Sequence, residues 1–511
     1  MIRQRFPLRS AVLVALIAAV SLLAFSSSAG AGESQTYIVL FKGGAGTAGD
    51  AAAIEKAGGT VVHNYTEIGV AVARSASPSF ADRLAKSSRV EGVSATARFA
   101  TRLNHGLDSS ADAASVAVNT PVSDTDDLSP LQWDMALIHA PEAHAITGGS
   151  SDVVVGDIDT GLDYEHPDLA ANVDFANSVS CESGAPDQTP SAWYDNNGHG
   201  THTAGTIAAA ANDIGIVGVA PNVKIAGIKS SNDDGFFLPE MVICSFMWAG
   251  SHDIDVTNNS YFADPWLFNC RNDHEQHAIW KAEQRAIRYA MSNGVVVVSA
   301  TGNENIDLSK KNTDTISPDF PPGNETTREV TNACVVIPVE IPGVIGVSGV
   351  GPLGTKSFFS TYGVSATDVT APSGDSLQAP NPFGRVLSTF SHGVSPDENL
   401  FYLERNRLHM DPPGCVNATT GVSAAGCAVW IYLQGTSMAS PHAAGVAALI
   451  MSQRKLPAGA VGAALQSSAD EIPCPNPRTV EDILGPATCF GGSGYNGFYG
   501  HGLVNAEAAV Q

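Results

Sequence analysis

Four short motifs, far apart in the sequence, carry residue types that suit the cleavage of an acyl bond. Asp159 stands in Asp-Thr-Gly directly after an apolar run, and His199 stands in Asn-Gly-His-Gly-Thr-His. Asn303 stands in Ala-Thr-Gly-Asn-Glu, and Ser437 stands in Gly-Thr-Ser-Met-Ala-Ser-Pro. A hydroxyl nucleophile needs an imidazole base, a carboxylate that orients this base, and a hydrogen-bond donor for the developing oxyanion. The four residues are therefore candidates for one catalytic site.

Taken alone, each motif has another interpretation. Asp-Thr-Gly also marks aspartic proteases, but these need two copies to share a proton, and this sequence has one. His199 and His202 could bind a metal as an i, i+3 pair, although no His-Glu-x-x-His motif is present. Ser437 could simply cap the apolar helix expected over Ala443 to Met451, and Asn303 could form a turn. The serine motif lacks the last glycine of Gly-x-Ser-x-Gly, which disfavours an α/β-hydrolase.

The elements that must position these residues alternate between strands and helices. Strands are expected at short β-branched apolar runs, and a helix with one apolar stripe is expected over residues 274–292. The run Val295–Val298 is apolar on both faces, as in a central parallel strand. This alternation predicts an α/β domain with a mostly parallel sheet, whose sites lie at the carboxyl ends of its strands. The other expected strands are Val153–Val155, Val223–Ile228 and Val344–Val350.

Composition divides the 511 residues into four parts. Residues 1–31 are typical of a signal peptide, with arginines at the start, an apolar run from Ala11 to Phe25 and a small-residue cleavage site. Residues 32–102 form a small cysteine-free unit whose pattern predicts a ferredoxin-like β-α-β-β-α-β fold. Residues 103–128 form a linker rich in Ser, Asp and Ala, and residues 129–511 form the large domain. We therefore expect a protein that is secreted and, once the signal is removed, free of the membrane.

The charge is strongly negative but unevenly distributed. The formal net charge is −24, and residues 1–102 are net basic whereas the remainder is acidic. An acidic body disfavours nucleic acids and anionic membranes as partners. The eight cysteines, an even number in a chain expected to be secreted, predict disulfides rather than a zinc or redox site. Only the close pairs Cys415–Cys427 and Cys474–Cys489 can be suggested from spacing.

The four motifs together resemble those of the subtilisin-like serine proteases, the subtilases, in which the catalytic residues follow the order Asp, His, Ser. Three further stretches support this resemblance, which covers about residues 130–511. They are Gly215–Pro221, Val256–Ser260 and Gly500–Ala506. Residues 37–102 resemble, more weakly, the inhibitory propeptide of the same family. The resemblance implies a subtilisin-like three-layer α/β fold that is preceded by a small ferredoxin-like propeptide domain.

The resemblance also implies a role for each residue of a serine endopeptidase site that acts on proteins or peptides. Ser437 would be the nucleophile, with His199 as its general base and then as the acid to the leaving amine. Asp159 would orient the imidazole. Asn303 and the backbone N–H of Ser437 would form the oxyanion hole. The wall of the substrate cleft would be formed by Ser260, Ala300, Thr301 and Gly302.

A structural calcium site follows from the same resemblance. Asp168 and Asn212 would supply side-chain oxygens, and three backbone carbonyls would complete an all-oxygen ligand set of the kind that Ca²⁺ prefers. These carbonyls belong to Ala210, Ile214 and Ile216. The alternative is an uncharged loop held by Asx-type hydrogen bonds. No organic cofactor is expected.

The family resemblance further implies a zymogen. The propeptide would act as an intramolecular inhibitor and folding chaperone, and the opposite charges of the two parts would favour its docking. Self-cleavage would then fall between about Phe99 and Leu128. The mature protein is expected to be a monomer in the extracellular space.

The sequence departs from the family near the cleft, which leaves its specificity open. Bulky residues stand at Phe236, Phe237 and Tyr261–Trp266, and residues 374–430 read as an insertion that holds two of the cysteines. A processing protease of narrow specificity is therefore an alternative to a broadly acting one. A third alternative, a catalytically silent binding module on the same fold, is disfavoured by the intact set of four candidate residues.

Overall fold

The structure, a computed structural model, describes most of the chain. The described residues are 34–43, 48–96, 121–311, 313–319, 323, 325–379, 382–394, 407–409 and 428–511. The expected signal peptide and the pair Cys415–Cys427 lie outside these residues, as does most of the expected linker. Within the described part of the chain, no helix is both long enough and apolar enough to cross a membrane.

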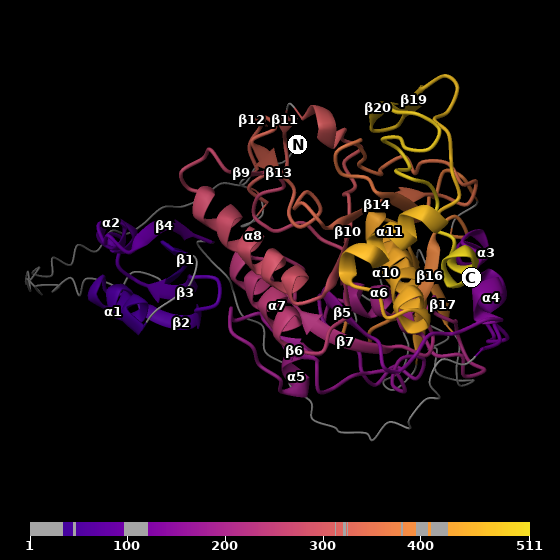
Figure 1. The fold of residues 1–511 in the computed structure, drawn as a ribbon, viewed down its shortest axis with the longest axis horizontal. Coiled ribbons are helices and arrows are strands. Elements are labelled where there is room, and N and C mark those ends of the chain that lie inside the picture. Colours follow the sequence, from indigo (N-terminus) through magenta and orange to yellow (C-terminus); the bar gives the residue numbers. More distant parts are fainter. Residues whose placement is uncertain are drawn as a thin grey trace, which may run out of the picture.

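The N-terminal unit has the predicted ferredoxin-like fold (Figure 1). Its elements are β1 (Gln35–Phe41), α1 (Ala48–Lys56), β2 (Thr60–Tyr65), β3 (Val70–Ser75), α2 (Phe80–Ala85) and β4 (Val90–Ala95). The four strands are antiparallel and lie in the order β2-β3-β1-β4. Because side chains alternate along a strand, Tyr37, Val39 and Phe41 pack with the two helices, whereas Ile38 and Leu40 face the large domain.

The large domain is built on a seven-stranded parallel sheet. Its strands are β5 (Val154–Asp159), β6 (Val179–Ser180), β7 (Lys224–Lys229), β8 (Val256–Asn259), β10 (Val296–Ala300), β14 (Ile345–Val350) and β15 (Val369–Pro372). They lie in the order β15-β14-β10-β8-β5-β7-β6, and every neighbouring pair is parallel. The strands β5, β7, β10 and β14 match the four predicted ones. Their valines and isoleucines are buried because helices cover both faces of the sheet.

Two pairs of helices cover the two faces of the sheet (Figure 1). They are α6 (His199–Ala208), α10 (Thr436–Gln453), α7 (Pro239–Ser251) and α8 (His277–Ser292). The strand β10 shows the division, since Val296 and Val298 pack with α6 and α10, whereas Val297 packs with α7 and α8. The helix α8 falls within the predicted range 274–292, and α10 continues through Pro441, which lies inside it.

Shorter elements connect and flank this core. The helical ones are η1 (Ser129–Leu131), α3 (Trp133–Leu137), α4 (Ala140–His144), α5 (Pro190–Trp193), η2 (Leu308–Lys310), α11 (Ala458–Ser468) and α12 (Ala506–Val510). The strands form three antiparallel pairs, β9 (Asn269–Cys270) with β13 (Cys334–Val335), β11 (Thr313–Asp314) with β12 (Arg328–Glu329), and β19 (Thr479–Asp482) with β20 (Gly485–Thr488). None of these six strands joins the central sheet.

The segment 374–430, interpreted from the sequence as an insertion, is in part an integral element of the domain. Its strands are β16 (Val386–Phe390), β17 (Arg407–His409) and β18 (Val429–Leu433), with β18 in the middle of an antiparallel sheet. The hydroxyls of Ser388 and Thr389 on β16 donate at 2.7 Å to the carbonyl oxygens of His202 and Thr201, respectively. The predicted boundary was therefore wrong, because a strand that supports α6 lies within the supposed insertion.

Three disulfides cross-link the large domain within the described residues, and two of them join distant parts of the chain. The predicted pair Cys474–Cys489 is confirmed, whereas Cys181–Cys244 and Cys270–Cys334 join residues that are 63 and 64 positions apart. The first of these long-range disulfides connects the segment after β6 to α7, and the second connects β9 to β13. Spacing gave no reason to choose the long-range pairs, because they depend on the tertiary fold.

Removing a disulfide is expected to destabilise the protein more when the bond closes a longer loop. From the loop entropy that it removes from the unfolded chain, Cys181–Cys244 is expected to raise the free energy of unfolding by about 4 kcal/mol and Cys474–Cys489 by about 3 kcal/mol. The double variant Cys181→Ala/Cys244→Ala should therefore melt at a lower temperature than the matched variant Cys474→Ala/Cys489→Ala in scanning calorimetry. An equal or reversed order of the two melting temperatures would contradict the loop argument.

Candidate active site

The carboxylate of Asp159 is fixed at the carboxyl end of β5, where parallel sheets place their sites. The residue is fully buried, and its Oδ1 contacts Nδ1 of His199 at 2.7 Å and accepts the backbone N–H of Thr160 at 2.8 Å. The chain turns away directly afterwards because Gly161 adopts a φ of +121°. A Cβ at this position would lie only 2.7 Å from the carbonyl oxygen of Trp193. Asp159 is thus held in one orientation, toward the imidazole.

His199 is the first residue of α6, and a small neighbour lets this helix approach β5 closely. A Cβ on Gly200 would lie 2.3 Å from the carbonyl oxygen of Gly161, so glycine is required at this contact. Burial lowers the pKa of His199, but the neighbouring carboxylates, that of Asp159 first, raise it above its ordinary value. The imidazole is therefore oriented through one nitrogen by a carboxylate, as a general base in such a site requires.

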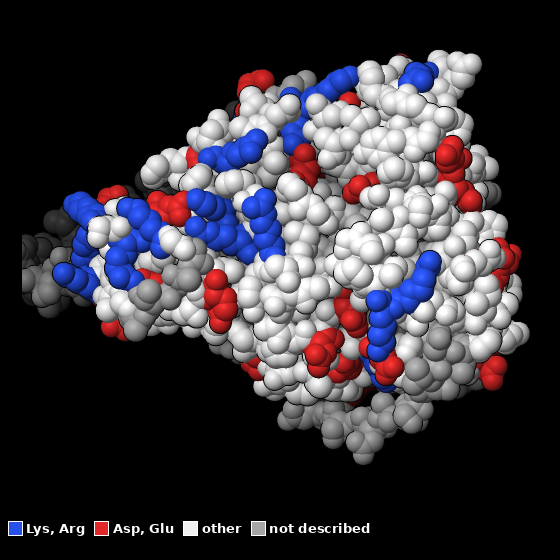
Figure 2. All heavy atoms as spheres, viewed as in Figure 1, with Lys and Arg blue, Asp and Glu red and all other residues white. Residues whose placement is uncertain are grey.

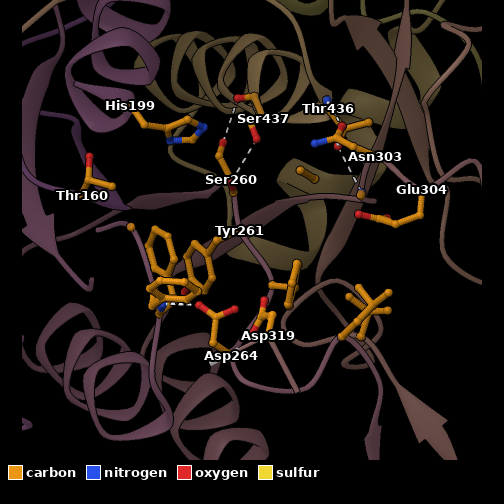
Figure 3. A pocket seen from close by; sticks show the side chains of 18 of the residues that line it. Thr160, His199, Ser260, Tyr261, Asp264, Asn303, Glu304, Asp319, Thr436 and Ser437 are labelled. Carbon is orange, nitrogen blue, oxygen red and sulfur yellow. Dashed lines mark hydrogen bonds between the residues drawn. The ribbon is translucent and has the colours of Figure 1, made fainter. Parts of the chain in front are cut away.

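Ser437 is the second residue of α10, so its backbone N–H is among those left without a partner in the helix. Its hydroxyl donates to the carbonyl oxygen of Ser260 at 3.1 Å, and the Ser260 hydroxyl donates in return to the carbonyl oxygen of Ser437 at 2.9 Å. His199 and Ser437 line the same cleft and face each other across it (Figure 3). In this arrangement the serine hydroxyl is hydrogen-bonded to Ser260 rather than to the imidazole.

Asn303 follows β10, and its amide is oriented by the start of α10. Its Oδ1 accepts hydrogen bonds from the backbone N–H of Thr436 at 2.8 Å and from the Thr436 hydroxyl at 3.0 Å. These bonds occupy the acceptor side of the amide and leave the Nδ2 donors for the cleft that Ser437 also lines (Figure 3). The amide of Asn303 and the N-terminus of α10 therefore present hydrogen-bond donors to the same space.

The cleft has a volume of about 350 Å³ and brings the predicted binding residues together with three of the catalytic candidates. Its lining includes every residue predicted for the substrate wall, namely Ser260, Ala300, Thr301 and Gly302. Bulky side chains noted in the sequence also line it, and the ring of Phe237 stacks on that of Tyr261 with their centroids 4.1 Å apart. These departures from the family pattern therefore fall on the cleft itself.

Acidic side chains that were not among the predicted site residues also line the cleft. They are Asp234, Asp264, Glu304 and Asp319, and no Lys or Arg is among the described residues of the lining. Burial raises the pKa values of Asp264, Glu304 and Asp319, and the nearby Asp319 carboxylate adds to the effect on Asp264. Figure 3 shows Asp264 and Asp319 close together below Tyr261. A positively charged group that enters the cleft would therefore find acidic side chains that are not paired with a Lys or Arg of the described lining.

A further buried acid lies directly behind the catalytic candidates. Asp157 precedes Asp159 by two residues on β5, so both side chains leave the same face of the sheet. Its carboxyl group contacts the hydroxyl of Thr203 at 2.7 Å and accepts a hydrogen bond from Nδ2 of Asn258 at 2.8 Å. Asp157 has no motif of its own, and its one signal in the sequence is an acid within an apolar strand, two positions before the terminal aspartate.

The residues predicted to bind calcium come together only in part. Asp168 Oδ2 accepts hydrogen bonds from the Ile216 N–H at 3.0 Å and from Nε1 of Trp430 at 2.7 Å, whereas its Oδ1 is buried without a hydrogen-bond partner. Burial raises the pKa of Asp168 to about 8. The exposed Asn212 accepts the Ile214 N–H at 3.2 Å, as in an Asx turn. Among the described residues, no group of three or more His, Cys, Asp or Glu side chains could hold a metal.

The two histidines of the second motif have different partners. His202 is buried and contacts the carbonyl oxygen of Ile431 through Nε2 at 3.2 Å, whereas His199 contacts Asp159. Burial lowers the pKa of His202 to about 3, which keeps its imidazole neutral. The geometry therefore favours a structural role for His202 over a metal shared by the pair.

Comparisons with known proteins identify the family of the chain. A model of the subtilase family matches residues 150–502. The chain is 28% identical over 379 residues to subtilisin from Bacillus pumilus, and this alignment covers 74% of this chain and 98% of that protein. It is 27% identical over 393 residues to fervidolysin from Fervidobacterium pennivorans, and this alignment covers 76% of this chain and 44% of that protein.

Two solved structures share the fold. The epidermin leader peptide processing serine protease of Staphylococcus aureus aligns over 94% of this chain and 98% of that chain, with a TM-score of 0.64 and 22% identity. A protease of Pseudoalteromonas arctica aligns over 76% of this chain and 99% of that chain, with a TM-score of 0.51 and 26% identity. Because the family model spans more than half of the sequence, the conclusion does not depend on any one relative. The chain belongs to the subtilase family and is a serine endopeptidase with a subtilisin-like fold.

Proposed function

We propose that the protein hydrolyses peptide bonds with Ser437 as the nucleophile, His199 as the general base and Asp159 as the residue that orients the base. The observation that carries this proposal is the 2.7 Å contact between Asp159 Oδ1 and His199 Nδ1, beside a cleft that Ser437 also lines. This contact fixes the imidazole with its other nitrogen available for the serine, and it stabilises the imidazolium that forms during the reaction.

The reaction begins when the Ser437 hydroxyl turns from Ser260 toward His199 by rotation about its Cα–Cβ bond. His199 takes the hydroxyl proton as the serine oxygen attacks the peptide carbonyl carbon, and it then passes this proton to the leaving amine. Nδ2 of Asn303 and the Ser437 N–H stabilise the oxyanion of the tetrahedral intermediate. A water molecule, deprotonated by the same imidazole, hydrolyses the acyl-enzyme and restores the serine.

The N-terminal unit is proposed to be the inhibitory propeptide and folding chaperone of a zymogen. One face of its sheet packs against α7 and α8 through Ile38, Leu40, Val70 and Val72. Arg285 of α8 donates to the carbonyl oxygens of Phe41 and Ile68 at 3.2 and 3.1 Å, and Tyr65 donates its hydroxyl to the carbonyl oxygen of Gly184 at 2.8 Å. An apolar centre with hydrogen bonds around it supports stable docking of the unit on the enzyme.

The local charges at this junction run opposite to the expectation from overall charge. Figure 2 shows Lys and Arg gathered over the N-terminal unit and its junction with the large domain. In the ion pairs themselves, the unit contributes the acid Glu91, and α8 contributes Lys281 and Arg285. Burial raises the pKa of Glu91, but these two cations lower it below its ordinary value. The pairs support one specific orientation of docking rather than a general attraction.

The chain leaves the N-terminal unit beside the cleft, which supports self-processing. Thr96 ends the described part of the unit, and the Glu240 side chain at the start of α7 hydrogen-bonds with it. Phe236 and Phe237, which line the cleft, come just before this helix. Thr96 therefore lies near the helix that follows the cleft residues Phe236 and Phe237, and self-cleavage between about Phe99 and Leu128 is the proposed maturation step.

Secretion is proposed from the N-terminal sequence and is supported by the disulfides. Structural disulfides persist in oxidising compartments, and three of them are present within the described residues. After removal of the signal peptide and the propeptide, the enzyme is proposed to act as an extracellular monomer on protein or peptide substrates.

A structural calcium ion at Asp168 and the loop 210–216 is also part of the proposal. The buried, unpartnered Oδ1 of Asp168 suits a cation ligand, and the loop is held beside it because the Ala210 N–H donates to the carbonyl oxygen of Asp168 at 2.7 Å. Since N–H donors occupy Oδ2, Asp168 would bind the ion through Oδ1 alone. The remaining oxygens would come from Asn212 and from the carbonyls of Ala210, Ile214 and Ile216.

The acidic lining of the cleft favours a narrower version of the function, a processing protease that selects cationic side chains. A Lys or Arg of the substrate would supply the positive charge that the lining lacks among its described residues. Asp264 would gain most, because burial and the neighbouring Asp319 carboxylate otherwise raise its pKa and oppose its ionisation. Burial also raises the pKa of Asp319, although its hydrogen bond with Asp264 opposes this. A catalytically silent binding module remains disfavoured, since His199, Asn303 and Ser437 line one cleft.

Replacing the proposed nucleophile tests catalysis and self-processing together. Ser437→Ala is expected to abolish peptide hydrolysis, labelling by a fluorophosphonate probe and removal of the propeptide. Asn303→Ala should lower kcat about 100- to 1,000-fold with little change in KM, because one oxyanion donor is lost. Ser452→Ala, a control on the same helix, should behave like the parent. Normal processing of the Ser437→Ala chain in a host without other proteases would contradict the proposal.

Removal of calcium is expected to lower the thermal stability of the parent protein, because a bound ion stabilises the folded state by mass action. Asp168→Asn should abolish the dependence of Tm on calcium, since it removes the one carboxylate of the proposed ligand set. Asp152→Asn, at an exposed position, is the matched control and should keep this dependence. A parent Tm that is the same in calcium and in EGTA would exclude the site.

A diverse peptide library separates broad from narrow specificity. If the acidic lining selects substrates, cleavage sites should be enriched in Lys or Arg near the cleaved bond. Asp319→Asn should then lower kcat/KM for such peptides about tenfold, or roughly 1.4 kcal/mol, relative to peptides with glutamine in their place. Asp152→Asn again serves as the control for loss of one negative charge. Efficient cleavage at many unrelated sites would contradict selection by the acidic lining and would support a broadly acting protease.

A further inference from the structure

Asp157 belongs to none of the proposed catalytic groups, yet it connects the structural elements that carry them. It is fully buried on β5, it contacts α6, and through Asn258 it reaches the start of α10. We propose that Asp157 is an uncharged, protonated positioning residue that aligns the elements bearing Asp159, His199 and Ser437. This inference rests on the proposed function, because the alignment matters for catalysis only if those three side chains act together.

The connection to α6 goes through Thr203, one helical turn after His199. Asp157 Oδ2 lies 2.7 Å from the Thr203 hydroxyl, which also lies 3.0 Å from the carbonyl oxygen of Gly200 and 3.4 Å from that of His199. Residues i and i+4 share one face of a helix. A hydrogen bond at Thr203 therefore fixes the rotation of the helical turn that presents the imidazole.

The connection to α10 goes through β8. Nδ2 of Asn258 donates to Asp157 Oδ1 at 2.8 Å and lies 3.1 Å from the Ser260 hydroxyl, which donates to the carbonyl oxygen of Ser437 at 2.9 Å. The hydroxyl of Ser440 donates to Oδ1 of the same Asn258 at 2.6 Å. Asp157 is therefore joined to Ser440 of α10 through one intervening side chain, Asn258, and to Ser437 through two.

The protons of this network can all be placed when Asp157 is uncharged. Thr203 has one hydroxyl proton, and it can donate this proton to the Gly200 carbonyl if Asp157 Oδ2 donates its own proton to Thr203. Asp157 Oδ1 remains free to accept from Asn258, so each of these groups has a partner. With an ionised Asp157, Thr203 would instead donate its proton to the carboxylate, and the Gly200 carbonyl oxygen would keep only the helical N–H of residue 204 as its donor.

The charges around Asp157 favour the same form. The ionisable groups that face it are Asp159 on its own strand and His199 on α6. The neighbouring strand β8 presents the neutral Asn258, Gly227 is its register partner on β7, and α10 reaches it only through serine hydroxyls. Burial and the Asp159 charge raise the pKa of Asp157 well above its ordinary value, although its hydrogen bonds and His199 oppose this.

An uncharged Asp157 also leaves His199 usable as a base. A second carboxylate in this buried site would stabilise the imidazolium and reduce the neutral fraction of His199, and only neutral imidazole can accept the serine proton. A protonated carboxyl group makes the same hydrogen bonds without adding this charge. Asp157 can therefore align the catalytic elements without altering the proton affinity of the base.

The charge of Asp157 is tested by Asp157→Asn, which keeps the shape and the hydrogen-bonding pattern of a protonated carboxyl group. The measurement is the pH dependence of kcat/KM of the mature enzyme, with active sites counted by fluorophosphonate titration. We expect kcat/KM to stay within about threefold of the parent and the acid limb, which reports His199, to stay in place. A shift of the acid limb to lower pH by about one unit would show that a negative charge was removed and would overturn the uncharged form.

The positioning role is tested by removing the hydrogen bonds. Asp157→Leu and Thr203→Val should each lower kcat by about 10- to 100-fold with little change in KM, because misplaced catalytic groups slow chemistry more than binding. Thr206→Val is the matched control, since Thr206 is buried on the same helix but donates to the carbonyl oxygen of His202, away from Asp157. If Asp157→Leu does not fold, Thr203→Val decides alone. A parent-like kcat in Thr203→Val would overturn the positioning role.

The outcomes for this inference and for the proposed function are distinct. If the parent enzyme is not labelled at Ser437 by the fluorophosphonate probe, the proposed catalytic site fails and the role of Asp157 fails with it. If the parent is labelled and active but Thr203→Val keeps the parent kcat, only the inference about Asp157 fails.

Discussion

The hydrogen bond between Asp159 and His199 sets the geometry on which the rest of the site depends. A strand and a helix must approach until two side chains are 2.7 Å apart, and this approach leaves no room for other side chains between them. Glycines therefore stand at 161 and 200, where a Cβ would come within 2.7 and 2.3 Å of backbone carbonyl oxygens. The parallel sheet, the two helical layers and the strand β16 all serve to hold β5 and α6 in this relation.

Buried acids are a second constraint around this hydrogen bond. Asp157 lies behind the pair, and Asp264, Glu304 and Asp319 line the cleft in front of it. The low polarity of their surroundings disfavours their charged forms, so a strongly acidic composition does not translate into a strongly charged site. Because burial favours their protonated forms, these acids add less negative charge around the His199 imidazole than the sequence composition suggests.

The sequence predicted those parts of the site that local motifs encode. Asp159, His199, Asn303 and Ser437 each stand at an end of an element with a clear pattern, so strands and helices could be placed around them. The acids Asp264 and Asp319 meet in the cleft only because the intervening chain folds back, and neither has a motif of its own. The long-range disulfides and the pairing of β16 with β18 were missed for the same reason, since tertiary packing decides them.

Pro441 lies inside α10, four residues after Ser437. In an α-helix the N–H of residue i+4 donates to the carbonyl oxygen of residue i, and proline has no N–H to donate. The carbonyl oxygen of Ser437 is thus left without its helical donor, and the hydroxyl of Ser260 supplies the missing bond. A hydrogen bond from the segment that holds Ser260 therefore completes the first turn of the helix that carries Ser437. A shift of that segment would displace or weaken this bond and so alter the position of the Ser437 backbone.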